Sequence, residues 1–184
     1  MNRSQSVSVL VIMVMILAAA VTRLIPHWPN FTAVGAMALF GAAYLPKRWM
    51  AFVVPFATLY LSDLIINNIL YAGYYDHFVW RISPFVYLAF GLIILIGYLL
   101  RDRVSTGRVF GASITASTLF FLLTNFAVWL GSPVFPQNAA GLLGAYEAGL
   151  PFFWSTLAGD LFYSAVLFGG FAWLSQRLPQ LKKA

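Results

Sequence analysis

Residues Pro26 to Leu45 read PHWPNFTAVGAMALFGAAYL, and this stretch decides how the rest of the chain is organised. Prolines flank His27 and Trp28 at its start. Because proline fixes its own backbone and lacks an N–H donor, we expect this segment to end the preceding helix and to be rigid. The second half is rich in small residues, which let another helix come close. The stretch therefore predicts a stiff binding mouth joined to a closely packed helix.

The composition is that of an integral membrane protein. Of the 184 residues, 61% are hydrophobic and 9% are charged, and the mean hydropathy is +0.84. A soluble domain carries about 25% charged residues. The chain has no cysteine, which excludes disulfides, thiolate metal sites and cysteine nucleophiles. The net charge of +6 fits basic cytoplasmic loops, so we expect no nucleic-acid partner.

The hydropathy pattern predicts an all-α, polytopic fold, a single domain over 1–184. A membrane span needs about 20 mostly apolar residues. Six segments qualify as helices of one compact bundle: 7–25, 31–46, 49–70, 84–100, 109–131 and 151–174. The second is short, so it spans the membrane only if it begins near His27 or lies where the bundle is thin.

The distribution of Lys and Arg predicts that both termini are cytoplasmic. With six spans, the side of the termini holds nine basic residues and the other side holds two. The nine are Arg3, Lys47, Arg48, Arg101, Arg103, Arg108, Arg177, Lys182 and Lys183, and the two are Arg23 and Arg81. The outer loops, Tyr71–Ile82 and Gly131–Leu150, are longer and aromatic. They fit either an interfacial aromatic belt or a lid over a pocket.

The polar residues within the spans gather in the outer half of the bundle. At about 1.5 Å per helical residue, Asp63, Asn125 and Asp160 lie about 10, 9 and 14 Å below the outer surface. A carboxylate in hydrocarbon costs several kcal/mol unless it is paired or hydrated. We therefore expect an outward-facing pocket lined by His27, Asn30, Asp63, Asn67, Asn125 and Asp160, with Tyr60, Trp80, Trp129 and Tyr163 stacking on a ring system.

Structural interpretations of the same residues stay open. Asp63 could form an ion pair with Arg23, and Asp160 could bond Asn125 or Thr124 across helices. His27 could cap a helix end. The small-residue pairs, Ala38 with Ala42 and Gly111 with Thr115, serve either packing within the chain or docking of a partner or a second copy.

Four patches of the sequence resemble a small bacterial membrane-protein family without an assigned activity. These are Pro26–Ala36, Pro55 with Ser62-Asp63-Leu64, Thr124–Trp129, and Pro151-Phe152-Phe153 with Gly159-Asp160-Leu161. The family is similar in size, span count and topology to the substrate-binding S components of energy-coupling-factor vitamin transporters. It most resembles the solitary cobalamin-type S components.

The resemblance implies roles for particular residues. His27 and Asp63 fall where the cobalamin-type proteins use a rim histidine and a third-span aspartate, and Tyr87 matches a tyrosine early in the fourth span. The cobalt-binding cysteine of that group is missing, since Ile82, Ser83 and Pro84 stand at the nearby positions. His27 then remains as a cobalt ligand if the solute is a corrinoid.

These observations predict a transporter of the bacterial cytoplasmic membrane that takes up a small vitamin-type solute, such as cobalamin or a related corrinoid. We expect no resident cofactor or metal and no catalysis. The expected partners are the solute, the lipid bilayer, and either a shared energy-coupling module or a second copy. The alternatives are an accessory subunit of a membrane complex and a lipid-modifying enzyme that uses Asp63 and Asp160 as acid and base.

Overall fold

The computed structural model describes residues 3–80, 83–178 and 180–181, and within this part of the chain the secondary structure is helical, without a strand. The all-α prediction is thus confirmed. The helices are α1 (Arg3–Val21), α2 (Val34–Tyr44), α3 (Arg48–Ile65), α4 (Pro84–Tyr98), α5 (Thr106–Gly131), α6 (Ala139–Ser164) and α7 (Gly170–Arg177). Short helical turns extend them: η1 (Thr22–Leu24), η2 (Ile66–Leu70), η3 (Ala72–Tyr74) and η4 (Ala165–Gly169).

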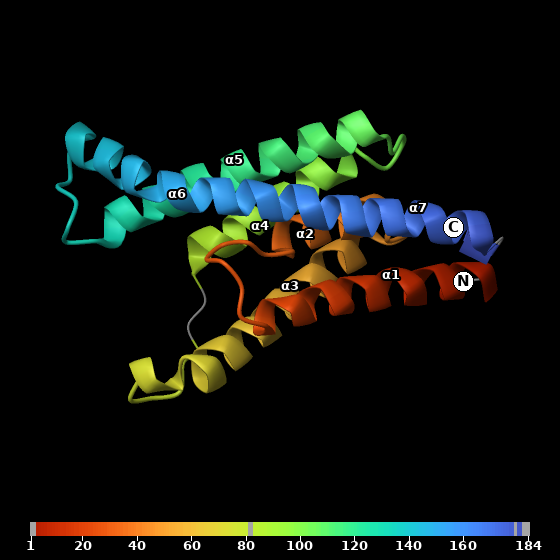
Figure 1. The fold of residues 1–184 in the computed structure, drawn as a ribbon, viewed down its shortest axis with the longest axis horizontal. Coiled ribbons are helices and arrows are strands. Elements are labelled where there is room, and N and C mark those ends of the chain that lie inside the picture. Colours follow the sequence, from red (N-terminus) through yellow and green to blue (C-terminus); the bar gives the residue numbers. More distant parts are fainter. Residues whose placement is uncertain (1–2, 81–82, 179, 182–184) are drawn as a thin grey trace.

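The helices form six rods, because η2 extends α3 and η4 joins α6 to α7 without a break. Within the described residues, four rods are long and apolar enough to cross a membrane: Gln5–Leu24, Arg48–Leu70, Thr106–Gly131 and Ala139–Arg177. Both termini lie at one end of the bundle (Figure 1). Arg81, Lys182, Lys183 and the side chain of Arg3, which entered the charge count, lie outside the described part.

α2 is the buried centre of the bundle. Each residue from Val34 to Ala43 is buried, and α1, α3, α4 and α6 all pack against this helix. α4 comes closest at Gly97, where an added Cβ would lie 2.6 Å from the Cβ of Ala42. The pair Ala38 and Ala42 therefore serves packing within the chain. At about 1.5 Å per residue, α2 is about 16 Å long, half of a bilayer core of about 30 Å.

The helix predicted over 31–46 begins later than expected and does not extend back toward His27, because the chain turns first. The N–H of Phe31 donates to the carbonyl of Trp28 at 3.0 Å, which closes a tight turn. Pro29 occupies its second position, and Asn30 occupies its third with a left-handed φ of 63°. These are the requirements of a type II turn. The backbone becomes helical only at Val34.

The prediction that the last span begins at residue 151 is also wrong. α6 begins at Ala139, where the side chain of Asn138 caps the helix by accepting from the N–H of Gly141 at 2.9 Å. Pro151 lies inside the helix, a position that transmembrane helices tolerate. Most of the expected outer loop is thus helical and forms the first part of α6, which pairs with α5 in a long hairpin (Figure 1).

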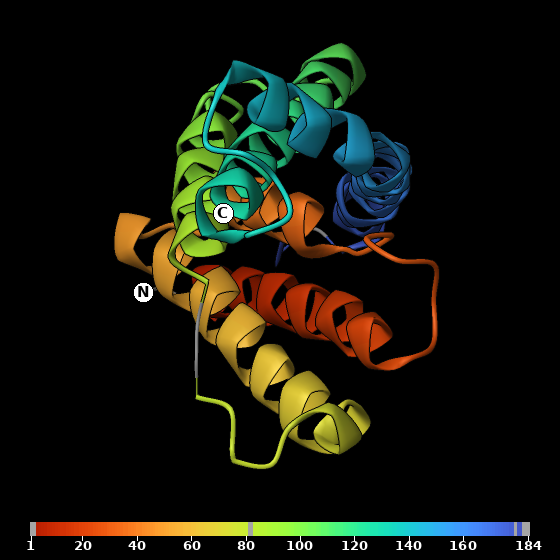
Figure 2. The same cartoon turned by 90° about the vertical axis from the view of Figure 1, so that its left-hand side faces the viewer.

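The end opposite the termini opens into two arms. One arm is the α5–α6 hairpin, and the other consists of the ends of α1 and α3 (Figures 1 and 2). Residues 25–33 cross between the arms and connect α1 to α2. This is the end at which the sequence places the polar residues.

Candidate functional site

A cavity of about 340 Å³ lies between the arms, at the first residues of α2. We call it the polar cavity. Val34, Val86, Phe90, Ile93 and Phe120 form much of its apolar wall. Its polar wall consists of Arg23, Asn30, Thr32, Asp63, Asn67, Ser83, Thr156 and Asp160. Side chains that are distant in the sequence therefore meet at one depth of the bundle.

Arg23 and Asp63 form an ion pair on this wall. Nη2 of Arg23 lies 2.9 Å from Oδ1 of Asp63, and Nη1 of Arg23 donates to the hydroxyl of Ser62. The two charged side chains are 12% and 27% exposed. A pair this sheltered loses much of its hydration, and the mutual attraction offsets that cost. The guanidinium also keeps a buried Nε without a hydrogen-bond partner in the described structure.

Asp160 serves as the cap of α2, although it belongs to α6. Its Oδ2 accepts from the hydroxyl of Ser117 at 2.7 Å, and its carboxyl also accepts from the backbone N–H of Ala36. α2 has no side-chain cap of its own, since Ala33 stands at the capping position. The first N–H groups of a helix need acceptors, and a carboxylate there also suits the helix dipole. Asp160, which is 3% exposed, supplies such an acceptor.

Two glycines make this cap possible. A Cβ on Gly35 would overlap the carboxyl of Asp160, so only glycine leaves room for that carboxyl. A Cβ on Gly159 would lie 2.9 Å from the backbone nitrogen of Thr32, which explains how the segment before α2 passes so close to α6. The Gly-Asp pair at 159–160 and the glycine at 35 therefore act together.

Two neighbouring asparagines, Asn67 and Asn68, make different contacts. Asn67 lines the polar cavity. Asn68 faces the aromatic segment instead: its Nδ2 donates to the carbonyl of Val79 at 3.0 Å, and its Oδ1 accepts from the N–H of Val79 at 2.6 Å. Both lie in the π-helical turn η2. Such turns are rare and occur frequently at functional sites.

The predicted site residues Tyr60, Trp80 and Tyr87 lie beside the polar cavity rather than in it. Together with Val53, Phe56 and Ala57 they line a shallow space of about 610 Å³ between α3 and α4. We call it the aromatic hollow. The other aromatic residues of the outer segment pair with one another, as Tyr71 does with Tyr74. They do not line the polar cavity within the described structure.

Four predicted site residues lie away from the polar cavity. The exposed ring of His27 has Nδ1 2.7 Å from the carbonyl oxygen of Ile25. Asn125 donates to the carbonyl of Phe121 at 2.9 Å and packs on Gly149. Trp129 donates to the carbonyl of Pro136 at 2.9 Å, and the ring of Tyr163 packs against that of Phe31 with ring centroids 5.9 Å apart. Each of these contacts stabilises a turn or a helix pair.

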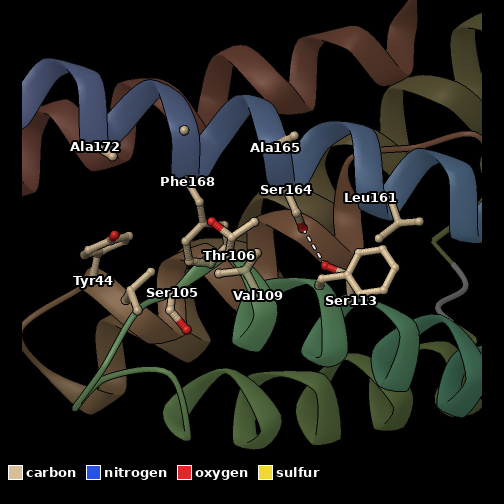
Figure 3. Close-up of a pocket in the computed structure, with 13 residues that line it drawn as sticks. Tyr44, Ser105, Thr106, Val109, Ser113, Leu161, Ser164, Ala165, Phe168 and Ala172 are labelled. Atoms are coloured by element: carbon tan, nitrogen blue, oxygen red, sulfur yellow. Dashed lines mark hydrogen bonds between the residues drawn. The ribbon is translucent and has the colours of Figure 1, made fainter.

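A third space lies between α5 and the η4 turn. It has a volume of about 460 Å³, and Figure 3 shows Tyr44, Val109, Leu161 and Phe168 around it. Its polar feature is the pair Ser113 and Ser164, whose hydroxyls are 2.8 Å apart and satisfy each other (Figure 3). We call it the serine groove. It is larger than the polar cavity, but no charged side chain lines its described part.

Residues 3–181 match a family described as "Family of unknown function (DUF6580)". The chain belongs to the DUF6580 family. No curated protein and no solved structure matches it.

For this DUF6580 chain, sequence reasoning missed several residues of the polar cavity. Arg23 entered only as a partner for Asp63, although an arginine at the end of an apolar span was itself a signal. Ser117 carried no signal, because a serine among small and apolar residues does not reveal its neighbour. Among the described residues, no group of three or more His, Asp or Glu side chains could hold a metal ion.

Proposed function

We propose that the polar cavity binds a small polar solute at the outer side of the membrane and that the protein takes part in its uptake. The observation that carries the proposal is the position of the cavity: it lies at the start of α2, a helix of half a membrane's length whose preceding backbone is not helical. Non-helical backbone at membrane depth is tolerated where it is buried in protein or lines a water-filled cavity. Asn30 and Thr32 belong to this segment and line the cavity.

Transporters with broken helices place solute sites in the same way, beside helix ends near the middle of the bilayer. In this chain the acceptors for α2 come from Asp160, so the carboxyl is already paired. Asp63 is likewise paired with Arg23. Two carboxyls with structural partners suit a binding site better than acid–base catalysis, which needs a group within reach of a proton on the substrate.

The size of the cavity favours a small solute. Binding sites for drug-sized molecules have volumes of about 300–1,000 Å³, and the polar cavity is at the lower end. A vitamin with one or two rings fits this range. A corrinoid, which the resemblance to cobalamin-type S components implies, is far larger, so its binding would require the two outer arms to move apart. The corrinoid and the coupling module remain predictions.

The accessory-subunit alternative has support of its own. The pairs Arg23–Asp63 and Asp160–Ser117 connect helices, as expected of residues that hold a bundle together. In that case, replacing Asp63 lowers the stability of the protein and changes nothing else. In the transporter case, replacing a cavity residue without a structural partner changes ligand binding. Asn67 is such a residue, since it lines the cavity and the described structure shows no hydrogen bond from its side chain.

The test is thermal unfolding of the purified protein in detergent with thiamine, riboflavin, biotin, pantothenate or cyanocobalamin. A ligand at a hundred times its Kd stabilises the folded state by about 2.7 kcal/mol. We expect one probe to raise the Tm of the wild type and of Thr115→Ala, whose hydroxyl bonds its own helix at the exposed face of α5. In Asn67→Ala the rise should be smaller or absent.

A probe that stabilises Asn67→Ala and Thr156→Val as much as the wild type would place its site outside the polar cavity. A full panel without any shift, together with a lower Tm for Asp63→Asn, would favour the accessory subunit.

A further inference from the structure

The outer halves of α3 and α4 form a seam with a space on each side. On α3, Leu59 and Asp63 face the polar cavity, whereas Phe56 and Tyr60 face the aromatic hollow. On α4, Val86 lines the polar cavity and Tyr87 lines the hollow. Figures 1 and 2 both show α3 running away from α4 toward its outer end. The two spaces are therefore neighbours across one seam.

A pair of aromatic rings closes this seam. The rings of Phe56 and Tyr87 are stacked, with centroids 5.5 Å apart and an angle of 18° between their planes. Stacked rings of this kind attract each other by dispersion and their quadrupoles, but no hydrogen bond fixes them. A pair without a polar tie can separate at low cost and close again.

The hydroxyl of Tyr87 is buried and has no hydrogen-bond partner in the described structure. It is near enough to Asp63, Arg23 and Tyr60 to interact with their charges or dipoles. The ring of Tyr87 lines the hollow, and its buried hydroxyl is within electrostatic reach of the Arg23–Asp63 pair. A buried hydroxyl without a partner loses its hydration without compensation, so such groups are rare unless something else satisfies them.

The outer face of the hollow is apolar, as a surface toward lipid must be. Val53 and Trp80, which line it, are 52% and 66% exposed. Among the described residues, its wall contains no charged side chain. The polar cavity behind the seam holds Arg23, Asp63 and Asp160. The Phe56–Tyr87 pair therefore separates an apolar space from a space with charged side chains.

We propose that the solute is amphipathic, with a planar apolar part and a hydrogen-bonding part, and that it enters sideways from the outer leaflet between α3 and α4. This inference rests on the proposed function. The apolar ring occupies the aromatic hollow beside Tyr60 and Trp80. The polar part passes the Phe56–Tyr87 pair, bonds the hydroxyl of Tyr87 and reaches the Arg23–Asp63 pair.

Labelling of a single cysteine tests the route without knowledge of the solute, because the native chain has no cysteine. Thr156→Cys places a thiol on the far wall of the polar cavity. In proteoliposomes it is treated with N-(1-pyrenyl)maleimide, a planar apolar reagent that dissolves in the bilayer, or with a trimethylammonium methanethiosulfonate, which stays in water. Each rate is measured with Phe56 intact and with Phe56→Ala.

We expect Phe56→Ala to raise the pyrenyl rate about tenfold, which corresponds to the loss of one aromatic pair. The rate of the water-soluble reagent should stay within about twofold. A thiol at Thr115, on the exposed face of α5, is the control and should react equally in both backgrounds. Phe56→Leu repeats the test if the alanine variant does not fold.

An unchanged pyrenyl rate, or an equal rise for both reagents, would overturn the lateral route, because the seam would then be closed or open to water. The proposed function would survive that result if a probe still stabilised the protein through Asn67. Tyr87→Phe gives a second readout. We expect the free protein to keep its Tm or gain a few degrees. The affinity for the probe, measured from the probe-induced rise in Tm, should fall about tenfold. Unaltered affinity would remove the Tyr87 hydroxyl from the proposal.

Discussion

Asp160 and Arg101 stand at opposite ends of α2 and hold it by its backbone. Asp160 accepts from the N–H of Ala36 at the first turn. At the other end, Nε of Arg101 donates to the carbonyl of Ala42 at 3.0 Å, and its Nη2 donates to the carbonyl of Leu45. An acceptor for the first N–H groups and a cationic donor to the last carbonyls satisfy the backbone groups that a helix leaves open at its ends. Both ends of α2 thus have side-chain partners from other helices or loops.

We predict that Gly35→Ala destabilises the protein by about 1–3 kcal/mol, since the added methyl group would overlap the carboxyl of Asp160. Gly111→Ala is the matched control, because Gly111 is also helical and its new Cβ would have no neighbour within 4 Å. That change should be neutral or stabilise by up to about 1 kcal/mol. Thermal unfolding in detergent checks both, and equal effects would contradict the cap.

Arg101→Gln should lower the stability by about 1–2 kcal/mol, because charged donors to the last carbonyls of α2 are lost. Arg103→Gln removes the same charge from an exposed position two residues further on and should have little effect. Comparison of the two Tm values separates the bonds to α2 from the net charge. If both variants lose equal stability, the cap at this end of α2 contributes nothing of its own.

Asn68→Ala should loosen the aromatic segment, since both bonds to the backbone of Val79 disappear. Hydrogen exchange followed by mass spectrometry should show faster exchange in peptides that cover residues 69–78. Asn67→Ala changes the same residue type at the next position and should leave this exchange unaltered. Faster exchange in both variants would mean that η2, rather than the Asn68–Val79 bonds, holds the segment.

The turn before α2 should accept glycine and reject a branched residue at position 30. Asn30 has a φ of 63°, a region in which β-branched side chains are strained by about 1–2 kcal/mol. Asn30→Gly should therefore unfold within a few degrees of the wild type, and Asn30→Val should unfold earlier. If the two variants have the same Tm, the turn has no left-handed residue at this position.

Much of the fold follows from hydropathy and charge alone. Apolar stretches predict the helices, and an even number of spans places the two termini together. The position of Asp63 and Asp160 toward the end of the bundle opposite the termini could also be derived, because counting residues along a helix gives depth. For Asp63 the sequence allowed two interpretations, an ion pair with Arg23 or a contact with a ligand. Both need the same residues at the same depth, so the sequence does not separate them.

The first residues of α2 and α6 were not predicted correctly, because each is set by a local hydrogen bond. The turn at Trp28–Phe31 delays α2 to Val34, and the cap at Asn138 starts α6 well before Pro151. Hydropathy does not register either feature, because a turn and a cap depend on single hydrogen bonds. Both corrections change the site, since the late start of α2 leaves room for the polar cavity.

The sequence by itself determined that this chain is a helical membrane protein whose polar residues lie toward one surface, because each of these properties depends on one helix at a time. The tertiary structure alone decided which of those residues meet. Rotation of each helix about its axis turns Asp160 toward Ser117 and α2, and turns Asn125 toward Gly149 instead. That rotation is set by contacts between glycines and side chains of different helices, which no single segment of the sequence contains.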